Sequence, residues 1–591
     1  MSSELRQRRP YVEPESESVE EEEEGEKGEK GEAGGGGGAR KSAGPGWVGA
    51  FVFLMIARYY SASYNIIHDC DEVFNYWEPL HYLLYKSGFQ TWEYSSEFAL
   101  RSYLYLLLHA AVGGPSFWFY GTGFSKVQVF FTLRLALGLL SAVTEATLVA
   151  VVTRRYGARM GMYTLGILCI SSGCFNASTS LLPSSFSMYA ITLAAALVLS
   201  GRRQHRATVA VAAFGVLVGW PFAAMAAAPL VVYSLATGGF LQVFCSGLIT
   251  TICTMVLSVL TDRFFYGRWT SSILNLVFYN VFSEEGSTLY GVEGPLFYFK
   301  NAFNNFNFAF PFALLCPLVL LLSSKRKYCK LVLAVSPIFV WLAFMSLQPH
   351  KEERFLYPVY PLICLAAAST LDNLHNIFPE WWKSHDILSF FTEAVKKIRP
   401  LILGVILALS YSRTLSLWYG YYAPMQVYQH LPVINDTSPS TTTTTVSTIC
   451  VGNEWYQYPS SFFLSSSNYR VGWLQDGFEG ALPLPFVRAE GGTRSAPKYF
   501  NNKNKASPHQ YVADEGICDF LVELELDRPG HIYRSHDKET WEVIYAQRYL
   551  DKERSPAKYR AFFLPWAWEK SNQFGTYRLL KRIRKASVHS H

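Results

Sequence analysis

Charged residues are scarce in this chain. Asp, Glu, Lys and Arg make up 17% of its 591 residues, whereas half of the residues are hydrophobic. Soluble proteins contain about 25% charged residues, so the composition excludes an ordinary soluble globular protein and indicates a polytopic membrane protein. The net charge of +6 is too small to indicate nucleic-acid binding, and the basic residues stand in clusters between apolar runs, where membrane topology explains them.

Metal-binding motifs are missing as well. The ten cysteines form no CxxC pair, and the chain has neither an HExxH motif nor a Cys/His knuckle. Cys450 and Cys518 fall in the polar C-terminal part, where a disulfide can form if that part lies in an oxidising lumen. Cys70 stands alone among acids. The other seven lie in or beside apolar runs and are most simply small hydrophobic side chains: Cys169, Cys174, Cys245, Cys253, Cys316, Cys329 and Cys364.

No apolar segment precedes Trp47, so we expect no cleavable signal peptide. Residues 1–46 are of low complexity and include five consecutive glutamates, Glu20 to Glu24. We expect a disordered, acidic, cytosolic tail. Arg40 and Lys41, just before the first apolar run, favour the cytosolic side for this end of the chain.

Apolar runs alternate with Lys/Arg clusters along residues 47–412, which predicts a transmembrane domain with a luminal first loop, 63–126. About eleven crossings are expected, and this odd number places the C-terminus in the lumen. The runs 103–112 and 273–281 are too short to cross, so we expect them to be re-entrant or interfacial. The expected crossings are 47–62, 127–152, 160–175, 187–199, 207–219, 222–235, 241–260, 308–322, 331–347, 355–370 and 401–409.

Polar sequence follows the last apolar run. Residues 413–449 form a Ser/Thr-rich linker whose sequon, Asn435-Asp436-Thr437, is expected to be luminal and glycosylated. Segments such as 518–526 partly alternate between apolar and polar residues, as half-buried strands do. Residues 450–591 are therefore predicted to form a small luminal α+β domain.

Three acids stand within four positions directly after the first apolar run: Asp69, Asp71 and Glu72. Carboxylates are out of place there unless they are used, although acids at the end of a span can also be simply solvated. A helix that begins near Asp71 would place Asn75 on the same face, and Pro79 would break that helix or start a second one. Asp69-Cys70-Asp71 also has the DxD form of metal-binding sugar transferases, but no Rossmann-like segment accompanies it, so we expect no metal.

A second cluster, from His350 to Phe355, lies at a predicted luminal mouth between two spans. It offers three basic side chains beside two carboxylates, which suits a phosphate at a membrane surface. Ordinary flanking charge is the simpler alternative, but positive charge is depleted on the luminal side. Aromatic residues recur in the same predicted luminal segments and suit either sugar rings or an interfacial belt: Tyr76, Trp77, Trp92, Tyr94, Trp118, Tyr279 and Tyr290.

A set of longer motifs resembles a known family, the dolichyl-phosphate-mannose-dependent α-1,2-mannosyltransferases of N-glycan precursor assembly in the endoplasmic reticulum. The similarity covers the chain from about Trp47 to its C-terminus. Related mannosyltransferases that build glycolipid (GPI) anchors tend to have Pro where this chain has Cys70. The motifs are DCDE at 69–72, FNYWEP at 74–79, GFQTWEY at 88–94, RSY at 101–103, LPSSF at 182–186, GWPF at 219–222, HKEERF at 350–355 and CVGNEWY at 450–456.

The resemblance implies a GT-C fold, with luminal helices above a transmembrane catalytic domain in the endoplasmic-reticulum membrane. It implies transfer of mannose from dolichyl-phosphate mannose to dolichyl-diphosphate oligosaccharides that carry six and then eight mannoses. The donor is β-linked and the product α-linked, so the reaction inverts the anomeric carbon. A carboxylate must then accept the proton of the acceptor 2-hydroxyl. We expect Asp71 in this role, with Glu72 or Asp69 as the next candidates.

The remaining roles follow from the same resemblance. His350, Lys351 and Arg354 are expected to bind the donor phosphate, and Glu353 to orient Arg354. A further expectation concerns the acceptor, which Tyr76, Trp77 and Trp92 would hold. No cofactor is expected.

Alternative interpretations of the function change either the acceptor or the class of protein. A GPI-anchor mannosyltransferase would keep the fold. A lipid-linked sugar transporter would carry polar residues along its spans or have broken helices in symmetric halves, whereas here the acids lie in one loop. A scaffold without activity would be expected to lose the Asp71-Glu72 pair, which is intact.

Overall fold

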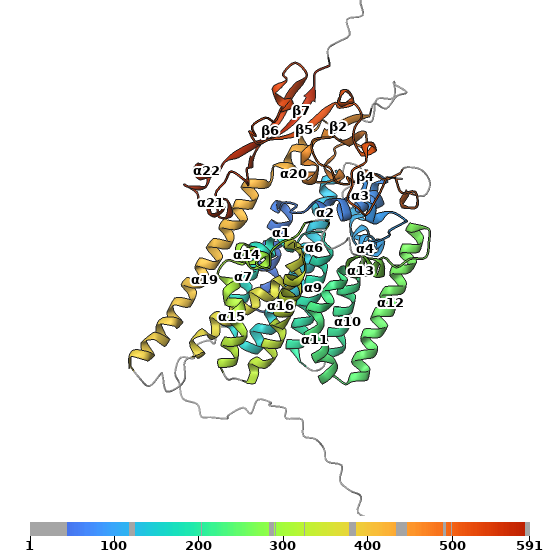
Figure 1. Cartoon of the computed structure of the whole chain (residues 1–591). Helices are drawn as coiled ribbons and strands as arrows, with labels where there is room; N and C mark the ends of the chain where they lie inside the picture. Colours follow the sequence, from blue (N-terminus) through green and yellow to red (C-terminus); the bar gives the residue numbers. More distant parts are fainter. Residues whose placement is uncertain are drawn as a thin grey trace, which may run out of the picture. The chain divides into compact units, whose positions relative to one another are not determined.

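The computed structural model describes residues 44–116, 125–201, 204–282, 289, 291–323, 326–377, 386–432, 446–487, 492–497 and 499–584. Most of them are helical, and a mixed sheet follows near the C-terminus (Figure 1). The expected disordered tail falls almost entirely outside the described residues, as do the sequon at Asn435 and two of the aromatic residues, Trp118 and Tyr290.

Six stretches are long and apolar enough to cross a membrane, judged among the described residues. They are α6 Lys126–Tyr156, α9 Pro183–Ser200, α12 Phe240–Tyr266, α16 Cys329–Leu347, the stretch Glu353–Asn376 that contains α17 Tyr360–Asn373, and Ser389–Tyr421 within α19 Asp386–Tyr421. A seventh crossing results if the bent pair α14 Phe297–Phe306 and α15 Ala309–Leu322 counts as one. The polytopic helical class is confirmed, and the expected eleven crossings remain a prediction.

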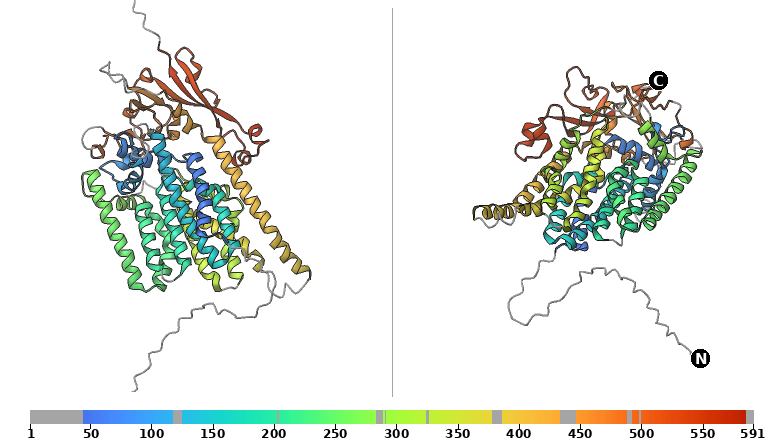
Figure 2. Two further views of the ribbon diagram at one scale, coloured as in Figure 1. Left: turned by 180° about the vertical axis from the view of Figure 1, so that it is seen from behind. Right: turned by 60° about the horizontal axis from the view of Figure 1, so that its bottom comes forward.

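Further helices complete the bundle (Figure 2). They are α1 Trp47–Tyr64, α4 Tyr103–Gly113, α7 Ala158–Ile170, α8 Ser172–Ala177, α10 His205–Phe214, α11 Ala224–Thr237 and α13 Ser272–Phe282. α17 lies at the centre and buries nearly all its side chains, whereas α12 leaves most of its apolar side chains exposed, as a lipid-facing helix does.

The two runs expected not to cross are short helices of 11 residues each, α4 and α13. A buried carboxylate, Asp262 near the end of α12, joins their N-termini. It accepts hydrogen bonds from the Ser102 hydroxyl and the Tyr103 backbone N–H at the start of α4. It also accepts one from the Ser272 N–H at the start of α13. One acid thus satisfies donors that both helix ends leave unpaired.

The helix that contains the expected crossing 401–409 is longer than that run, because α19 continues without a break for 36 residues to Tyr421, beyond the predicted domain boundary at 412. The polar residues beyond 409 do not end the helix. Ser412 and Ser416 donate hydrogen bonds to the backbone carbonyls of Phe563 and Arg560 in the C-terminal part. The apolar run ends where the helix passes from an apolar environment to a polar protein partner.

A five-stranded sheet forms the core of the C-terminal domain, in the order β3-β2-β5-β7-β6. Strand β2 is parallel to both neighbours, and β7 is antiparallel to β5 and β6. The strands are β2 Ser447–Val451, β3 Tyr469–Trp473, β5 Phe520–Glu525, β6 Trp541–Leu550 and β7 Phe574–Arg582. The short helices α20 Ala423–Val427, α21 Ala557–Ala561 and α22 Trp568–Ser571 accompany it. The predicted small α+β domain is confirmed.

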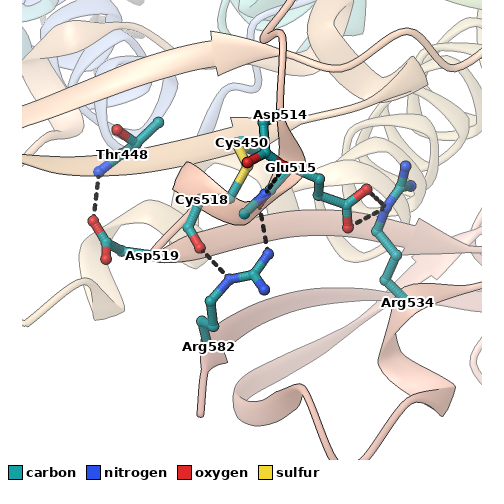
Figure 3. The surroundings of a disulfide bond; sticks show 9 residues. Thr448, Cys450, Asp514, Glu515, Cys518, Asp519, Arg534 and Arg582 are labelled. Atoms are coloured by element: carbon teal, nitrogen blue, oxygen red, sulfur yellow. Dashed lines mark hydrogen bonds and ion pairs between the residues drawn. A yellow bond between two sulfur atoms is a disulfide. The ribbon is translucent and has the colours of Figure 1, made fainter. Parts of the chain in front are cut away.

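The same domain contains a disulfide between Cys450 and Cys518, the pair that the sequence analysis singled out (Figure 3). Cys450 lies in β2 and Cys518 lies two residues before β5, so the bond joins β2 to the segment that leads into its parallel neighbour. Arg582 of β7 donates to the carbonyl oxygens of Cys518 and Glu515 beside it. The first loop adds a small two-stranded sheet in which β1 Phe89–Gln90 pairs with β4 Leu484–Pro485 of the C-terminal domain.

Candidate active site

One continuous helical segment, residues 70–85, carries two of the three acids; we call it the acid helix. It consists of α2 Cys70–Glu72, a π-helical turn η1 Val73–Trp77 and α3 Glu78–Tyr85. Asp69 is its N-cap residue and accepts a hydrogen bond from the backbone N–H of Asp71 at 2.8 Å. Pro79 has no N–H to offer the Asn75 carbonyl four positions before it, and the Tyr94 hydroxyl donates to that carbonyl at 2.7 Å instead, so the helix continues through Pro79.

The expected face shared by Asp71 and Asn75 is wrong. The π turn contains an i to i+5 hydrogen bond from Glu78 N–H to Val73 C=O, which shifts the register that an α-helix would have. Asn75 is buried and accepts a hydrogen bond from the Thr91 hydroxyl, whereas Asp71 is partly exposed. Sequence spacing alone does not reveal a π turn.

The acids meet the second motif through Arg354. Its Nη2 is 2.5 Å from Asp71 Oδ2, and its Nε is 3.1 Å from Asp69 Oδ2. Glu352 also pairs with Nε, and its other oxygen is 2.8 Å from His350 Nε2. The two sequence motifs, about 280 positions apart, therefore form one ionic network.

Burial differs along this network. The Arg354 side chain is 11% exposed, and those of Asp69 and Asp71 are 23% and 36% exposed. Burial raises the pKa of Asp69 to about 8, although Arg354 opposes the shift. Burial also acts on Glu352, but Arg354 and His350 outweigh it and hold the pKa of Glu352 below its usual range. Asp69 is therefore the protonated member at neutral pH, and Asp71 is the most exposed acid that Arg354 holds.

Glu72 lies apart from the network. Its side chain is buried, and Oε1 accepts hydrogen bonds from the Trp77 indole N–H at 3.0 Å and from the Leu181 backbone N–H at 2.9 Å. Burial raises the pKa of Glu72. These contacts tie the acid helix to the segment before α9, and they leave Glu72 a poorer candidate base than Asp71.

The expected partner of Arg354 was the wrong glutamate. Glu353 accepts hydrogen bonds from the side-chain amides of Asn301 at 3.1 Å and Asn305 at 2.7 Å, and Glu352 holds Arg354 instead. Adjacent residues at the start of a 3₁₀ segment, η8 Glu353–Val359, point in different directions, which the sequence does not specify. The Lys351 ammonium is buried and donates to the backbone carbonyls of Glu293 and Gln348.

The three aromatic residues expected to hold the acceptor are buried. Trp77 is fully buried, with its ring centroid 4.2 Å from that of Phe130. Tyr76 accepts a hydrogen bond from Arg101 Nη1 at 2.7 Å. Trp92 is 8% exposed and packs against neighbouring aromatic rings. The geometry favours packing roles for them, because aromatics beside the acids are needed to fill the space between the first loop and its neighbours.

Two cations that the sequence analysis did not single out, Arg134, which is buried, and Arg413, which is half-buried, act on His68. Arg134 of α6 donates to the Asn65 backbone carbonyl at 2.8 Å, and Arg413 lies on α19. The pKa of His68 is lowered to about 4, chiefly by burial, with Arg413 and Arg134 contributing to the shift. A basic residue inside an apolar run, as Arg134 is, is the signal that could have found them.

Among the described residues, one group of side chains could hold a metal ion: Asp69, Cys70 and Asp71. Ligand atoms of Asp69, Cys70 and Asp71 lie within 4.8 Å of one another. Arg354 already pairs with both carboxylates, so a cation would have to replace or join the guanidinium.

Comparison with known proteins gives one family. Residues 49–465 match the Alg9-like mannosyltransferase family. The chain is 51% identical over 546 residues to the α-1,2-mannosyltransferase ALG9 of Arabidopsis thaliana, with 92% of this chain and 93% of that protein covered. It is 36% identical over 566 residues to human α-1,2-mannosyltransferase ALG9, with 91% and 90% covered.

Among solved structures, ArnT from Cupriavidus metallidurans bound to undecaprenyl phosphate is similar at a TM-score of 0.44 and 13% identity, over 73% of this chain and 86% of that one. The family match spans most of the membrane part and the start of the C-terminal domain. It includes the acid helix and Arg354 with its partners. The chain therefore belongs to the Alg9-like mannosyltransferase family.

Proposed function

We propose that this chain transfers mannose in α-1,2 linkage from dolichyl-phosphate mannose to the six-mannose and eight-mannose dolichyl-diphosphate oligosaccharides of N-glycan precursor assembly. The observation that carries the proposal is the pairing of Asp71, a partly exposed carboxylate, with Arg354. Membership of a mannosyltransferase family supports the chemistry, and the relatives named above support the linkage.

The proposed transfer is one inverting displacement. The 2-hydroxyl oxygen of the acceptor mannose bonds to C1 of the donor mannose, the bond from C1 to the dolichyl-phosphate oxygen breaks, and the hydroxyl proton passes to Asp71. Such a step needs a carboxylate within hydrogen-bond reach of the hydroxyl and an electrostatic partner for the leaving phosphate. Asp71 is the best placed of the three acids because Glu72 is buried and the raised pKa of Asp69 leaves it protonated.

We assign the leaving phosphate to Arg354 and His350. Arg354 uses Nε and Nη2 on carboxylates, so its second terminal nitrogen carries the donors for phosphate oxygens. The hydrogen bond to Glu352 raises the pKa of His350, which favours its charged form. Lys351 contributes its charge through space, since its ammonium is held by two carbonyls.

We further propose that the protein lies in the endoplasmic-reticulum membrane, with the N-terminus cytosolic and the acids and the C-terminal domain luminal. Basic residues at the far end of α6, Arg154 and Arg155, support this orientation. The opposite end of α6 contacts the segment that contains Phe463 of the C-terminal domain.

The deciding experiment measures mannose transfer from dolichyl-phosphate mannose to the six-mannose lipid-linked acceptor, with and without a chelator. Wild type, Asp71→Asn and Glu353→Gln are compared at equal amounts of folded protein. We expect wild-type transfer to survive the chelator and the Asp71→Asn variant to lose a factor of about 100 or more. A glycolipid-anchor mannose serves as a second acceptor.

Each contrary result has a definite meaning. A normal rate for Asp71→Asn would remove Asp71 as the base. Loss of wild-type transfer in chelator would show that a metal takes part. Transfer only to the glycolipid-anchor acceptor would establish the alternative substrate.

A further inference from the structure

One face of the acid helix is turned toward the C-terminal domain. Phe74, Glu78, His81, Tyr82 and Tyr85 follow one another at intervals of one to four positions and all contact residues beyond 450. Asp71 lies one turn before Phe74 on the same helix. The face that is buried against the C-terminal domain therefore leads directly to the acid proposed as the base.

Glu78 is the polar centre of this face. Its side chain is fully buried, and its Oε2 accepts from the Phe89 backbone N–H at 2.9 Å and from the Ser461 hydroxyl at 2.8 Å. Oε1 accepts from the Ser461 backbone N–H at 2.5 Å and from the Ser460 hydroxyl at 2.8 Å. Three of these four donors belong to the C-terminal domain, so the carboxylate joins the two parts.

Aromatic contacts lie on either side of Glu78 along the acid helix. The Phe74 ring lies 5.9 Å from Trp455, 6.1 Å from Tyr458 and 5.9 Å from Trp473, measured between centroids. On the next turns, Tyr82 stacks on Phe486 at 4.0 Å. Buried aromatic pairs of this kind contribute beyond their buried area and fix orientation.

The backbone is fastened as well. Strand β1 of the first loop pairs with β4 of the C-terminal domain, and the Phe486 N–H donates to the Gly88 carbonyl at 2.9 Å. Gly88 has a φ of +149°, and a Cβ there would be 2.6 Å from the Glu78 carbonyl oxygen. Only glycine allows the loop after the acid helix to pass this close to Glu78.

The segment that binds the acid helix is itself attached to the sheet of the C-terminal domain. Trp455, Tyr458, Ser460 and Ser461 follow directly after β2, whose Cys450 is bonded to Cys518 (Figure 3). The disulfide therefore holds the start of this segment against the neighbouring strand. The sheet thus holds the Ser460-Ser461 turn, this turn binds Glu78, and Glu78 lies on the same helix as Asp71.

From these contacts we propose that the C-terminal domain positions the catalytic acid, and that Glu78 is the positioning residue through which it acts. The inference rests on the proposed function for its kinetic consequences. Asp71 and Arg354 come from separate elements, so their 2.5 Å contact requires the acid helix to be held in place. A displacement of about 1 Å in a catalytic group can cost about a hundredfold in rate.

Glu78→Gln is a sharp test because both carboxylate oxygens face a backbone N–H. Whichever way the amide is turned, its NH₂ group meets either Phe89 N–H or Ser461 N–H and leaves it unpaired. Ser461→Ala is the milder second variant: it removes one hydroxyl donor from Glu78, together with the hydroxyl that pairs with Tyr458 at 3.1 Å, and leaves the other three donors to Glu78 in place. Ser467→Ala, an exposed serine of the same segment, is the matched control.

Two measurements are made on full-length folded protein: kcat and KM for both substrates, and hydrogen–deuterium exchange of residues 70–77. We expect Glu78→Gln to lower kcat by about tenfold or more with both KM values within about twofold, and to speed exchange in the acid helix. Ser461→Ala should change both readouts in the same direction by a smaller factor. Ser467→Ala should match wild type.

Other outcomes overturn the proposal. Unchanged exchange and kcat in Glu78→Gln would show that the contact is dispensable, and if that variant does not fold, the same result in Ser461→Ala decides. A raised acceptor KM with unchanged kcat would mean that the domain reads the acceptor instead. If wild type transfers no mannose, the proposed function fails, while the exchange measurement still tests whether Glu78 holds the acid helix.

Discussion

At the scale of single residues, Arg354 decides how the site works, because it is shared by Asp69, Asp71 and Glu352. A guanidinium has enough donors in a fixed plane to serve several carboxylates and still face a phosphate. An ammonium has no such fork. The functional arrangement therefore depends on the identity of this side chain as well as on its charge.

Glu352 and Glu353 give a direct test of this arrangement, since they are adjacent and differ only in their partners. Glu352→Gln removes the negative charge beside Arg354 and His350 and leaves one acceptor oxygen for the two of them, so kcat should fall by about tenfold or more, and the pKa of His350 should drop. Glu353→Gln keeps one acceptor oxygen for Asn301 or Asn305 and removes no charge that pairs with Arg354, so it should cost less. The pH–rate profiles of both variants check this. A larger loss in Glu353→Gln would reverse the assignment of the two glutamates.

The raised pKa of Asp69 predicts a pH dependence. The carboxyl is neutral below about pH 8 and gains a negative charge as the pH rises through that value. The new charge lies beside Asp71 and competes for Arg354, so kcat should decline above about pH 8. Asp69→Asn mimics the neutral form and should retain most activity at pH 7 while losing the alkaline decline. If Asp69→Asn is instead as inactive as Asp71→Asn, Asp69 is the base.

At the scale of elements, a buried ion pair joins two helices of the bundle. Arg58 of α1 donates from Nη2 to Glu145 of α6 at 2.8 Å, and both side chains are at most 1% exposed. A further hydrogen bond from Arg58 to the Leu168 carbonyl links α7. The role of the pair in the fold is to fix how these three helices pack.

Removing one member of this pair should therefore be costly. Glu145→Gln leaves the Arg58 charge buried without its counter-ion, which is expected to destabilise the protein by about 3–5 kcal/mol. Replacing both, as Arg58→Met with Glu145→Gln, removes the charges together and should recover much of the loss. Thermal unfolding in detergent measures both variants. A single variant as stable as wild type would show that the pair contributes nothing to packing.

The length of an apolar run was enough to predict two of the elements from the sequence. The runs 103–112 and 273–281 are too short to cross, and they are the short helices α4 and α13. The extent of α19 was not predictable. Ser412 and Ser416 look like the polar end of a span, but their hydroxyls bind backbone carbonyls about 150 positions away in the chain. The same applies to the site: both motifs were found, but the choice between Glu352 and Glu353 depends on a local backbone direction that no spacing specifies.

At the scale of the whole molecule, the chain has the polytopic helical class predicted from its composition, with a C-terminal sheet domain joined to the first loop. The domain boundaries predicted from composition separate the first loop from the C-terminal domain, although the two are in direct contact. Glu78 and β1 belong to the membrane domain in sequence, yet their partners lie beyond residue 450. Such pairings across about 400 positions are invisible to periodicity.

The proposed topology makes the last prediction. If the acids and the C-terminal domain face the lumen, Asn435 of the linker is accessible to the glycosylation machinery and should carry a glycan. The chain has a second Asn-X-Ser/Thr sequon, Asn176-Ala177-Ser178, which should stay unmodified, because the Asn176 side chain is 1% exposed. Digestion with an N-glycan-releasing glycosidase should increase electrophoretic mobility in wild type and leave Asn435→Gln unchanged. A shift that persists in Asn435→Gln and disappears in Asn176→Gln would contradict the structure around α8, and no shift in wild type would contradict the expected modification of the linker.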